Sequence, residues 1–438
     1  MLDEGAYLVS GYLFASRRYW PFQDYGPWTN QMPLSFLFPG LVQVIFAPGL
    51  RTGRYFALFL GGLMVIGLWI VARRWGGKWA AAGVMLAVAA NPAIIKIYSL
   101  AISQVLVACL LVWVLVLILG EDRPLWQVLM GSALAGLLPL SRLNMLPALP
   151  LVCLYVYWQN GRKPGSLAAL IGFGIFVVGH VFFWPGILRM WAEWIPEAIA
   201  PFLNPWRPPA GMPLWNPNIG LQSRILSFLL GIRFHISAFT GLVATLLLWP
   251  GRGSWKSGSH FRASIFLAVL LSILLLAHAW ASLGINPQTY DALGRNYCTF
   301  CFPVYTAFYA NLGLILMAVS ISSWDRQVRS WRKFLILLTI LVFAAAIGFS
   351  AYDPVGDIWL KWRVPRILTF LQTGKILPGY VPLKLYIQRW GMEYSLARRL
   401  FPAAAGFIAG IMILGIAGII SFMRSKKKDL PKASFGYI

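Results

Sequence analysis

Long apolar runs recur along the whole chain, and they constrain its fold more than any other feature. One of them is FALFLGGLMVIGLWIVA at 56–72. Apolar runs of about 18 to 25 residues are long enough to cross a bilayer as helices. Of the 438 residues, 59% are hydrophobic and 11% are charged, whereas soluble domains carry about 25% charged residues. A transmembrane β-barrel would show short alternating segments instead. The sequence therefore predicts an all-α polytopic membrane protein.

We place about eleven membrane-crossing helices in the chain. They are expected at 54–73, 79–95, 99–119, 125–140, 143–159, 165–188, 224–249, 261–283, 297–321, 333–351 and 401–423. The apolar stretch 33–50 contains three prolines and two glycines, and we expect an interfacial or half-inserted helix there.

We treat the chain as one integral-membrane domain. Its parts are a first outer loop with interfacial helices at 3–53, a transmembrane bundle at 54–351, a last outer loop at 352–400, and a final helix with a basic tail at 401–438.

The distribution of charge predicts how the chain crosses the membrane. The net charge is +24, from 37 Lys and Arg against 13 Asp and Glu. In a soluble protein this balance would suggest nucleic-acid binding, but here the basic residues lie between apolar spans. Short loops such as ARRWGGK and QNGRKPG, and the tail MRSKKKD, are basic and are assigned to the cytoplasm. We expect a bacterial plasma-membrane protein that contacts anionic lipids and no nucleic acid.

The same orientation places the long segments on the outer face. These are 3–53, 189–223, 284–296 and 352–400. Because the chain would then begin on the outer side, we expect one more helix before Met1.

Carboxylates are scarce, yet three of them stand close together in the first outer loop. The segment MLDEGAYLVSGYLFASRRYWPFQDYGPWTNQMPLSF contains Asp3, Glu4 and Asp24, and the next carboxylate is Glu121. An aspartate held at the membrane interface and partly desolvated can act as a general base toward an acceptor hydroxyl. The alternative is that Asp3 and Glu4 solvate a chain end and that Asp24 caps a turn.

The first outer loop resembles that of type C (GT-C) integral-membrane glycosyltransferases. The pattern is D-E-G-x-Y, an amphipathic stretch, Y-W-P-F-x-D, and then Q-M-P-L. It is most similar to the branch of protein O-mannosyltransferases, lipid A aminoarabinose transferases and bacterial polyprenyl-phosphate-sugar transferases. In that branch a basic residue followed by Pro-Pro-Leu closes the loop. Here Gln31, Met32, Pro33 and Leu34 occupy this place, so the basic residue and the first proline are absent.

Two further stretches resemble the same family. GSALAGLLPLSRLNMLPALPLVCL resembles a pair of helices that meet at an outer-face arginine, here Arg142. LGRNYCTFCFPVYTAFYANLG resembles an Arg-x-Tyr element that enters a late span, here Arg295 and Tyr297. Where relatives often carry an acid in the fourth span, this chain has Gln104.

The resemblance implies a GT-C-like bundle that transfers a sugar from a polyprenyl-phosphate donor with inversion at the anomeric carbon. It implies that Asp3 is the base that deprotonates the acceptor hydroxyl. Stabilising the departing lipid phosphate requires fixed positive charge, and Arg142 and Arg295 are the candidates, because guanidinium groups bind phosphate bidentately. The alternatives are that Arg142 is a snorkelling anchor and that Arg295 pairs with Asp291.

Three more residues are candidates for binding the substrate. Glu4 and Asp24 could bind sugar hydroxyls, hold a divalent cation or orient the arginines. Tyr297 is a candidate ligand, with an interfacial aromatic role as the alternative. The sequence indicates no cofactor and no metal site beyond this optional cation.

Other polar residues receive simpler interpretations. Cys298 and Cys301 form C-x-x-C at helical spacing and are expected to pack as small apolar residues. His180, His235 and His278 lie in predicted spans without the spacing of a zinc site. The outer loops also contribute charged residues. Those of the Pro/Trp-rich loop could shape an acceptor groove or belong to an interfacial cover. Those of the last loop belong to a basic amphipathic stretch that is expected on the membrane surface and could touch the lipid phosphate. These charged residues are Glu193, Glu197 and Arg207 of the Pro/Trp-rich loop and Lys361, Arg363 and Arg366 of the last loop.

Three functions follow as hypotheses. The first is a glycosyltransferase acting on the outer face, with a lipid, glycan or protein acceptor. The second is a transporter or flippase for a lipid-linked glycan, which should place its ionisable groups near the bilayer midplane. Here the acids cluster in outer loops, which favours the enzyme. The third is a catalytically inactive accessory relative.

Overall fold

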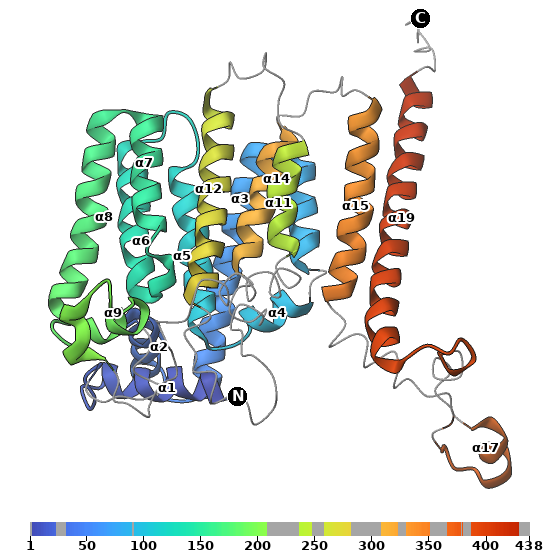
Figure 1. The fold of residues 1–438 in the computed structure, drawn as a ribbon, viewed down its shortest axis with the longest axis horizontal. Helices are drawn as coiled ribbons and strands as arrows, with labels where there is room; N and C mark the ends of the chain where they lie inside the picture. The colour runs from blue at the N-terminus through green and yellow to red at the C-terminus, as the bar shows by residue number, and fades with distance from the viewer. Residues whose placement is uncertain are drawn as a thin grey trace, which may run out of the picture. The chain divides into compact units, whose positions relative to one another are not determined.

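The computed structural model describes two compact units, residues Met1–Arg326 and Gln327–Ile438 (Figure 1). The described residues are 2–22, 32–89, 92–207, 236–247, 258–281, 308–322, 330–350, 366–377, 379 and 387–428. Within them every regular element is a helix. The predicted all-α polytopic class is confirmed.

The first unit contains most of the helices. They are α1 (Leu2–Ala15), α2 (Leu34–Ile45), α3 (Leu50–Ala89), α4 (Pro92–Tyr98), α5 (Ser103–Ile118), α6 (Leu125–Ser141), the 3-10 helix η1 (Leu143–Met145), α7 (Ala148–Asn160), α8 (Arg162–Phe182), α9 (Leu188–Trp194), the 3-10 helix η2 (Pro201–Trp206), α11 (Ile236–Leu247), α12 (Gly258–Ala281) and α14 (Phe308–Ser322).

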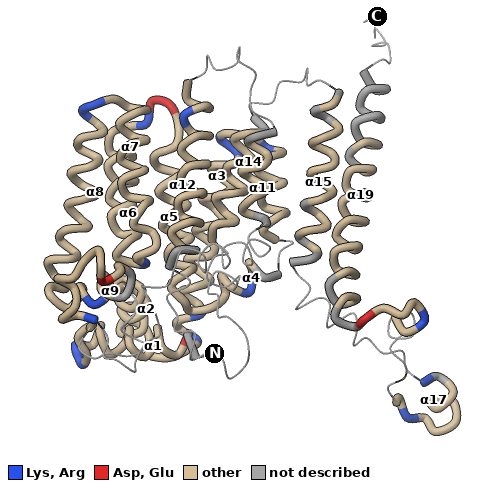
Figure 2. The backbone as a smooth tube through the Cα atoms, viewed as in Figure 1, with Lys and Arg blue, Asp and Glu red and all other residues tan. Residues whose placement is uncertain are grey.

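Three helices are long and apolar enough to cross a membrane, judged by length and composition. They are Leu50–Ala89, Arg162–Phe182 and Gly258–His278. Shorter apolar helices of the first unit are Leu34–Ile45, Ser103–Ile118, Leu125–Ser141 and Phe308–Ser320. Each span predicted between 99 and 321 therefore coincides with a helix over its described part. Figure 2 shows that the charged residues of this unit lie at the ends of the long helices, with uncharged residues between them.

Helix α3 consists of two helices joined at Gly77. The φ of 75° and ψ of −174° at Gly77 lie outside the helical region, in a conformation that glycine adopts without a Cβ clash. The chain then runs back along itself, since a Cβ added to Gly61 would lie 3.5 Å from the carbonyl oxygen of Tyr98. The two halves correspond to the spans predicted at 54–73 and 79–95.

Helices α1 and α2 pack together at one end of the bundle, where α1 lies across the ends of the long helices (Figure 1). The backbones meet at Gly11 and Gly40, where a Cβ on Gly40 would overlap the Gly11 carbonyl. The side-chain amide of Gln43 donates to the Leu8 carbonyl oxygen at 2.9 Å. A helix of 12 residues is too short to span about 30 Å of hydrocarbon. A short helix is therefore present within 33–50, and its expected interfacial or half-inserted position stays a prediction.

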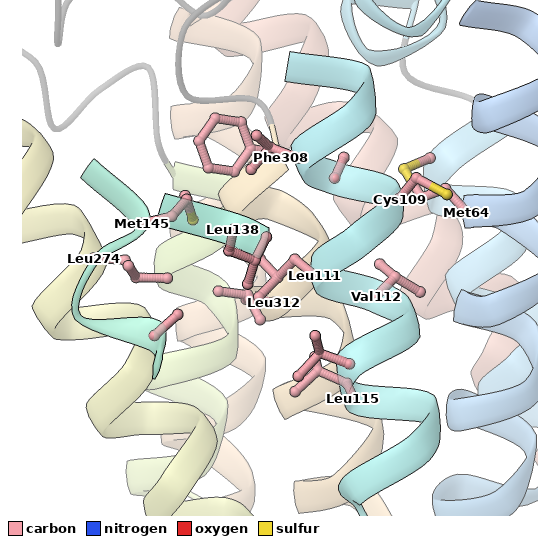
Figure 3. Close-up of a cluster of buried hydrophobic side chains, with 14 of the residues drawn as sticks. Met64, Cys109, Leu111, Val112, Leu115, Leu138, Met145, Leu274, Phe308 and Leu312 are labelled. Carbon is pink, nitrogen blue, oxygen red and sulfur yellow. The ribbon is translucent and has the colours of Figure 1, made fainter. Parts of the chain in front are cut away.

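The core of the bundle is apolar and closely packed. Side chains from α5, α6, α12 and α14 meet there, and Leu111, Leu138, Leu274 and Leu312 are fully buried (Figure 3). Cys109 is a free cysteine in the same region. This continuous apolar packing holds the helix ends, and therefore the polar side chains on them, in fixed positions.

Arginines cap helix α5 at the end of the bundle opposite α1. The Nη1 group of Arg74 donates to the carbonyl oxygens of Val116 at 2.8 Å and Leu119 at 3.1 Å. The Nε group of Arg123 donates to the same Leu119 oxygen at 2.9 Å. The last carbonyls of a helix lack partners within the helix and carry partial negative charge. These arginines therefore have a structural role at this end.

The second unit contains α15 (Ser330–Ser350), α17 (Ile367–Thr373) and α19 (Tyr394–Lys428). Helices α15 and α19 pack directly against each other. Small residues allow the close approach, since a Cβ on Gly348 would overlap the carbonyl of Pro402 and one on Gly406 would overlap that of Ala344. Small residues at such a crossing are typical of membrane helices.

Candidate active site

Glu4 fastens the first turn of α1 to the bundle. Its carboxylate is 1% exposed and accepts three hydrogen bonds. Arg54 of α3 donates through Nε at 3.0 Å and Nη2 at 2.9 Å, and the backbone amide of Ala101 donates at 3.0 Å. The Arg54 guanidinium lowers the pKa of Glu4, burial opposes this shift, and the Ala101 amide adds to the lowering. Glu4 is therefore a charged anchor for α1.

Tyr7 forms a second attachment one turn further along α1. Its hydroxyl lies 3.0 Å from the Oγ atom of Ser103, the first residue of α5. The ring of Tyr7 also packs against Phe36 of α2, with 5.4 Å between ring centroids. Glu4 and Tyr7 are three residues apart, and residues at this spacing lie near one face of a helix. This face is directed toward the start of α5.

Arg142 reaches the same place from α6. It follows the last residue of α6 and has an extended backbone, with φ −152° and ψ 127°, so the chain leaves the helix there. The Nη1 group of Arg142 donates to Ser103 Oγ at 2.9 Å, and its Nε group lies 3.4 Å from Asn144 Oδ1. The arginine is half-buried. Ser103 thus joins Tyr7 of the N-terminal motif to Arg142.

A buried polar cluster of Asn144, His278 and Tyr309 lies next to Arg142. The Nδ2 atom of Asn144 lies 2.8 Å from Nδ1 of His278 on α12 and 3.3 Å from the hydroxyl of Tyr309 on α14. With Oδ1 of Asn144 accepting from Arg142, its amide group donates to both partners. These contacts connect η1 with α12 and α14, and they fix the amide that faces the guanidinium.

The charge of Arg142 is met only by neutral groups within the described part of the chain. Its hydrogen-bond partners are a serine hydroxyl and an asparagine amide. The ion pair found among the described residues is that of Arg54 with Glu4. A half-buried guanidinium with neutral partners retains its full attraction for an anion. The arrangement is suited to binding a phosphate group.

The structure brings only some of the predicted site residues into view. Asp3 lies in the first turn of α1, with its side chain outside the described part. Asp24, Arg295 and Tyr297 lie outside the described residues, as do Gln31, His235, Cys298, Cys301, Lys361 and Arg363. Their assigned roles stay predictions. The proposed contact of Glu4 with substrate also stays a prediction, and both of its oxygens are engaged by Arg54.

Two of the remaining candidates, His180 and Arg207, have structural partners. His180 lies 2.9 Å from the Phe176 carbonyl through Nδ1 and accepts from Trp191 at 3.1 Å through Nε2. Arg207 donates to the carbonyls of Ala192 and Ile195 and so braces the turn after α9. No group of three or more metal-ligating side chains occurs within the described ranges. His180 and Arg207 therefore read as structural residues.

Five residues of this site were not singled out from the sequence. They are Tyr7, Arg54, Ser103, Asn144 and Tyr309. Tyr7 is the last residue of the D-E-G-x-Y pattern, and its place in that motif could have identified it as a site residue. Arg54 and Ser103 stand at the beginnings of apolar spans, where a basic or hydroxyl residue has many ordinary explanations.

Comparison with known proteins gives one group of similar structures. No protein-family model matches the sequence, and no curated protein matches it. Among solved structures, the chain is similar to two crystal structures of ArnT from Cupriavidus metallidurans. The structure bound to undecaprenyl phosphate has a TM-score of 0.47 and 16% sequence identity. The apo structure has a TM-score of 0.44 and 18% identity. Each similarity covers 92% of this chain and 71% of the other.

ArnT is a lipid A aminoarabinose transferase of the GT-C class. It belongs to the branch that the first outer loop resembles.

Proposed function

We propose that this protein is an inverting glycosyltransferase that takes a sugar from a polyprenyl-phosphate donor. The acceptor is a hydroxyl of a lipid, a glycan or a protein. The reaction takes place at the end of the bundle that carries α1, on the outer face of a bacterial plasma membrane, with the C-terminus in the cytoplasm.

The observation that carries the proposal is the surroundings of Arg142. Its guanidinium donates to the hydroxyl of Ser103, which in turn contacts Tyr7 of α1. Helix α1 begins with the motif residues Asp3 and Glu4. No described carboxylate lies within ion-pair distance of it. A lipid phosphate leaving the anomeric carbon needs such a fixed cation, because negative charge grows on its bridging oxygen during the reaction.

Asp3 is assigned the role of general base. It precedes Tyr7 by four residues, and positions four apart lie on the same face of a helix. In the proposed step the Asp3 carboxylate takes the proton of the acceptor hydroxyl, and the acceptor oxygen forms a bond to the anomeric carbon. The bond from that carbon to the phosphate oxygen breaks, and the lipid phosphate leaves with the electron pair. Attack opposite the leaving group inverts the anomeric centre.

The ion pair of Glu4 with Arg54 supports this assignment indirectly. It holds the first turn of α1 against α3 and against Ala101. A base one residue away from this anchor would be positioned without having to order a free chain end. Preorganisation of this kind contributes a large part of the rate enhancement of many enzymes.

The test is a sugar-transfer assay with the full chain in membranes and a panel of labelled undecaprenyl-phosphate sugars. Undecaprenyl phosphate is the ligand bound to ArnT and is the natural carrier to try first. We expect transfer by the wild type and a loss of about 10²–10⁴-fold in Asp3→Asn, with donor binding retained. Asp122→Asn, at an exposed loop position, is the matched control.

The other outcomes separate the alternatives. Transfer that survives Asp3→Asn would retain the enzyme and move the base to another carboxylate, with Asp24 the next to test. Binding of labelled lipid without transfer from any donor would favour the transporter or the inactive accessory protein. Absence of both binding and transfer would contradict the proposed function.

A further inference from the structure

Ser103 is the one residue in the described part of the chain that contacts both α1 and Arg142 through hydrogen bonds. It is 2% exposed. Three polar groups surround its Oγ atom: the hydroxyl of Tyr7 at 3.0 Å, Nη1 of Arg142 at 2.9 Å and Oε1 of Gln104 at 3.4 Å. A serine hydroxyl has one hydrogen to donate and two lone pairs to accept with. The three neighbours therefore match its full capacity.

The direction of these hydrogen bonds follows from the donors present. Arg142 can only donate, so Ser103 accepts from it. When Ser103 donates to Gln104, the hydroxyl of Tyr7 donates to the second lone pair of Ser103. Every group in this chain of contacts then has a partner, which a nearly fully buried hydroxyl requires.

Ser103 is not needed to cap its own helix. The residue preceding α5 makes no side-chain capping bond, and the hydrogen bonds found for the Ser103 hydroxyl go to side chains. A serine in this place that served only α5 would be expected to bond to the backbone of its first turn. The hydroxyl is instead directed toward two other elements.

We infer that Ser103 is a positioning residue, which fixes the guanidinium of Arg142 relative to α1. The inference rests on the proposed function, because it assigns to Arg142 the binding of the donor phosphate. Ser103 does not touch the phosphate itself. It fixes the position of Arg142, which binds the leaving phosphate, relative to α1, which carries the base Asp3. Gln104 completes the set with a neutral acceptor, so that the charge of Arg142 remains available to the anion.

The experiment is a double-mutant cycle between Ser103→Ala and Arg142→Gln in the full chain. Two quantities are measured for each variant: the dissociation constant of labelled undecaprenyl phosphate and the free energy of unfolding in detergent. Ser103→Ala should weaken lipid binding about tenfold, as expected for a lost hydrogen bond to a charged group. In the Arg142→Gln background the same change should have less than about a twofold effect.

Two further variants separate positioning from simple packing. Ser103→Thr keeps the hydroxyl and should bind lipid within about threefold of wild type. Tyr7→Phe removes only the hydroxyl of Tyr7 and should weaken binding by less than Ser103→Ala does. A Ser103→Ala variant that loses stability but binds lipid as the wild type does would overturn the inference and leave the proposed function intact.

Failure of the proposed function would look different. The wild type would then neither bind undecaprenyl phosphate nor transfer a sugar. The double-mutant cycle would in that case rest on the unfolding free energies alone. Non-additive unfolding free energies for Ser103→Ala and Arg142→Gln would still support a direct coupling of the two residues. Additive values would overturn it.

Discussion

Arg54 bonds directly to Glu4 of α1, and Arg142 bonds to Ser103, which contacts Tyr7 of the same helix; the surroundings of the two arginines differ. Arg54 meets the carboxylate of Glu4 in a two-point ion pair. Arg142 meets the hydroxyl of Ser103 and the amide of Asn144. In the first case the positive charge is neutralised inside the protein. In the second, among the described residues, the charge is held in place by neutral dipoles, which leaves it able to attract an external anion. The difference separates an anchor from a binding group.

The largest effect is expected at Arg142. Arg142→Gln should lower kcat/KM for transfer by about 10²–10³-fold, because the leaving phosphate loses its fixed cation. Arg142→Lys should lie between this variant and the wild type, since an ammonium keeps the charge but lacks the planar fork of donors. Steady-state kinetics with the labelled donor gives both values. Equal activity of Arg142→Gln and wild type would break the comparison, because Arg142 would then be an anchor like Arg54.

The second-largest effect is expected for a substitution in the contact between α1 and α2. In Gly40→Ala the new methyl group would overlap the carbonyl of Gly11, and we expect a loss of about 2 kcal/mol in unfolding free energy. Transfer should fall as well, because α1 carries the proposed base. The matched control is Gly5→Ala in α1, where a Cβ meets nothing within 4 Å and alanine should stabilise the helix by about 0.5–1 kcal/mol. If Gly40→Ala and Gly5→Ala have similar unfolding free energies and transfer rates, α1 is not held in a fixed position on α2.

Much of the fold could be predicted from the sequence, because membrane helices are defined by long apolar runs and by basic loops. The turn between 73 and 79 is an example, where the basic residues of ARRWGGK separate two apolar runs and Gly77 adopts the required conformation. The expectation of an interfacial or half-inserted helix at 33–50 came from its prolines and glycines, and it stays a prediction. Pro39 itself lies inside the helix and therefore does not end it.

The site was predicted only in part. Arg142 was identified through the family resemblance, and the structure places it beside α1. The roles of Arg54 and Ser103 depend on contacts across about 50 and 39 positions of sequence, and local pattern holds no information on such pairs. Glu4 was taken as a candidate ligand because it stands next to Asp3. Its partner Arg54 lies at the start of the next long helix.

The pH dependence of stability should distinguish the anchor from the binding group. Because the pKa of Glu4 is lowered in the folded protein, its stabilising contribution is present in full above the ordinary value of 4.5 and is lost as the pH falls through the folded value. Glu4→Gln should cost about 1.5 kcal/mol at pH 7, since Arg54 is 45% exposed and water weakens the pair.

Unfolding of Glu4→Gln and wild type should therefore be compared at several pH values. The difference between them should stay constant from neutral pH down to about pH 5 and shrink below it. The exposed carboxylate of Glu121 provides the control, and Glu121→Gln should match the wild type throughout. A difference that does not change with pH would mean that Glu4 contributes through its shape alone.

The smallest effect is expected at the opposite end of the bundle, where Arg123 donates to the carbonyl of Leu119. Arg123→Gln removes a cation from the end of α5 and should cost about 0.5 kcal/mol of unfolding free energy. It should leave the affinity for undecaprenyl phosphate and the rate of transfer unchanged, because the proposed donor site lies at the other ends of these helices. Lys163→Gln, an exposed change at the same end, should alter neither quantity. A tenfold loss of transfer in Arg123→Gln would show that cations at both ends act on the donor, and the division between structural and phosphate-binding arginines would fail.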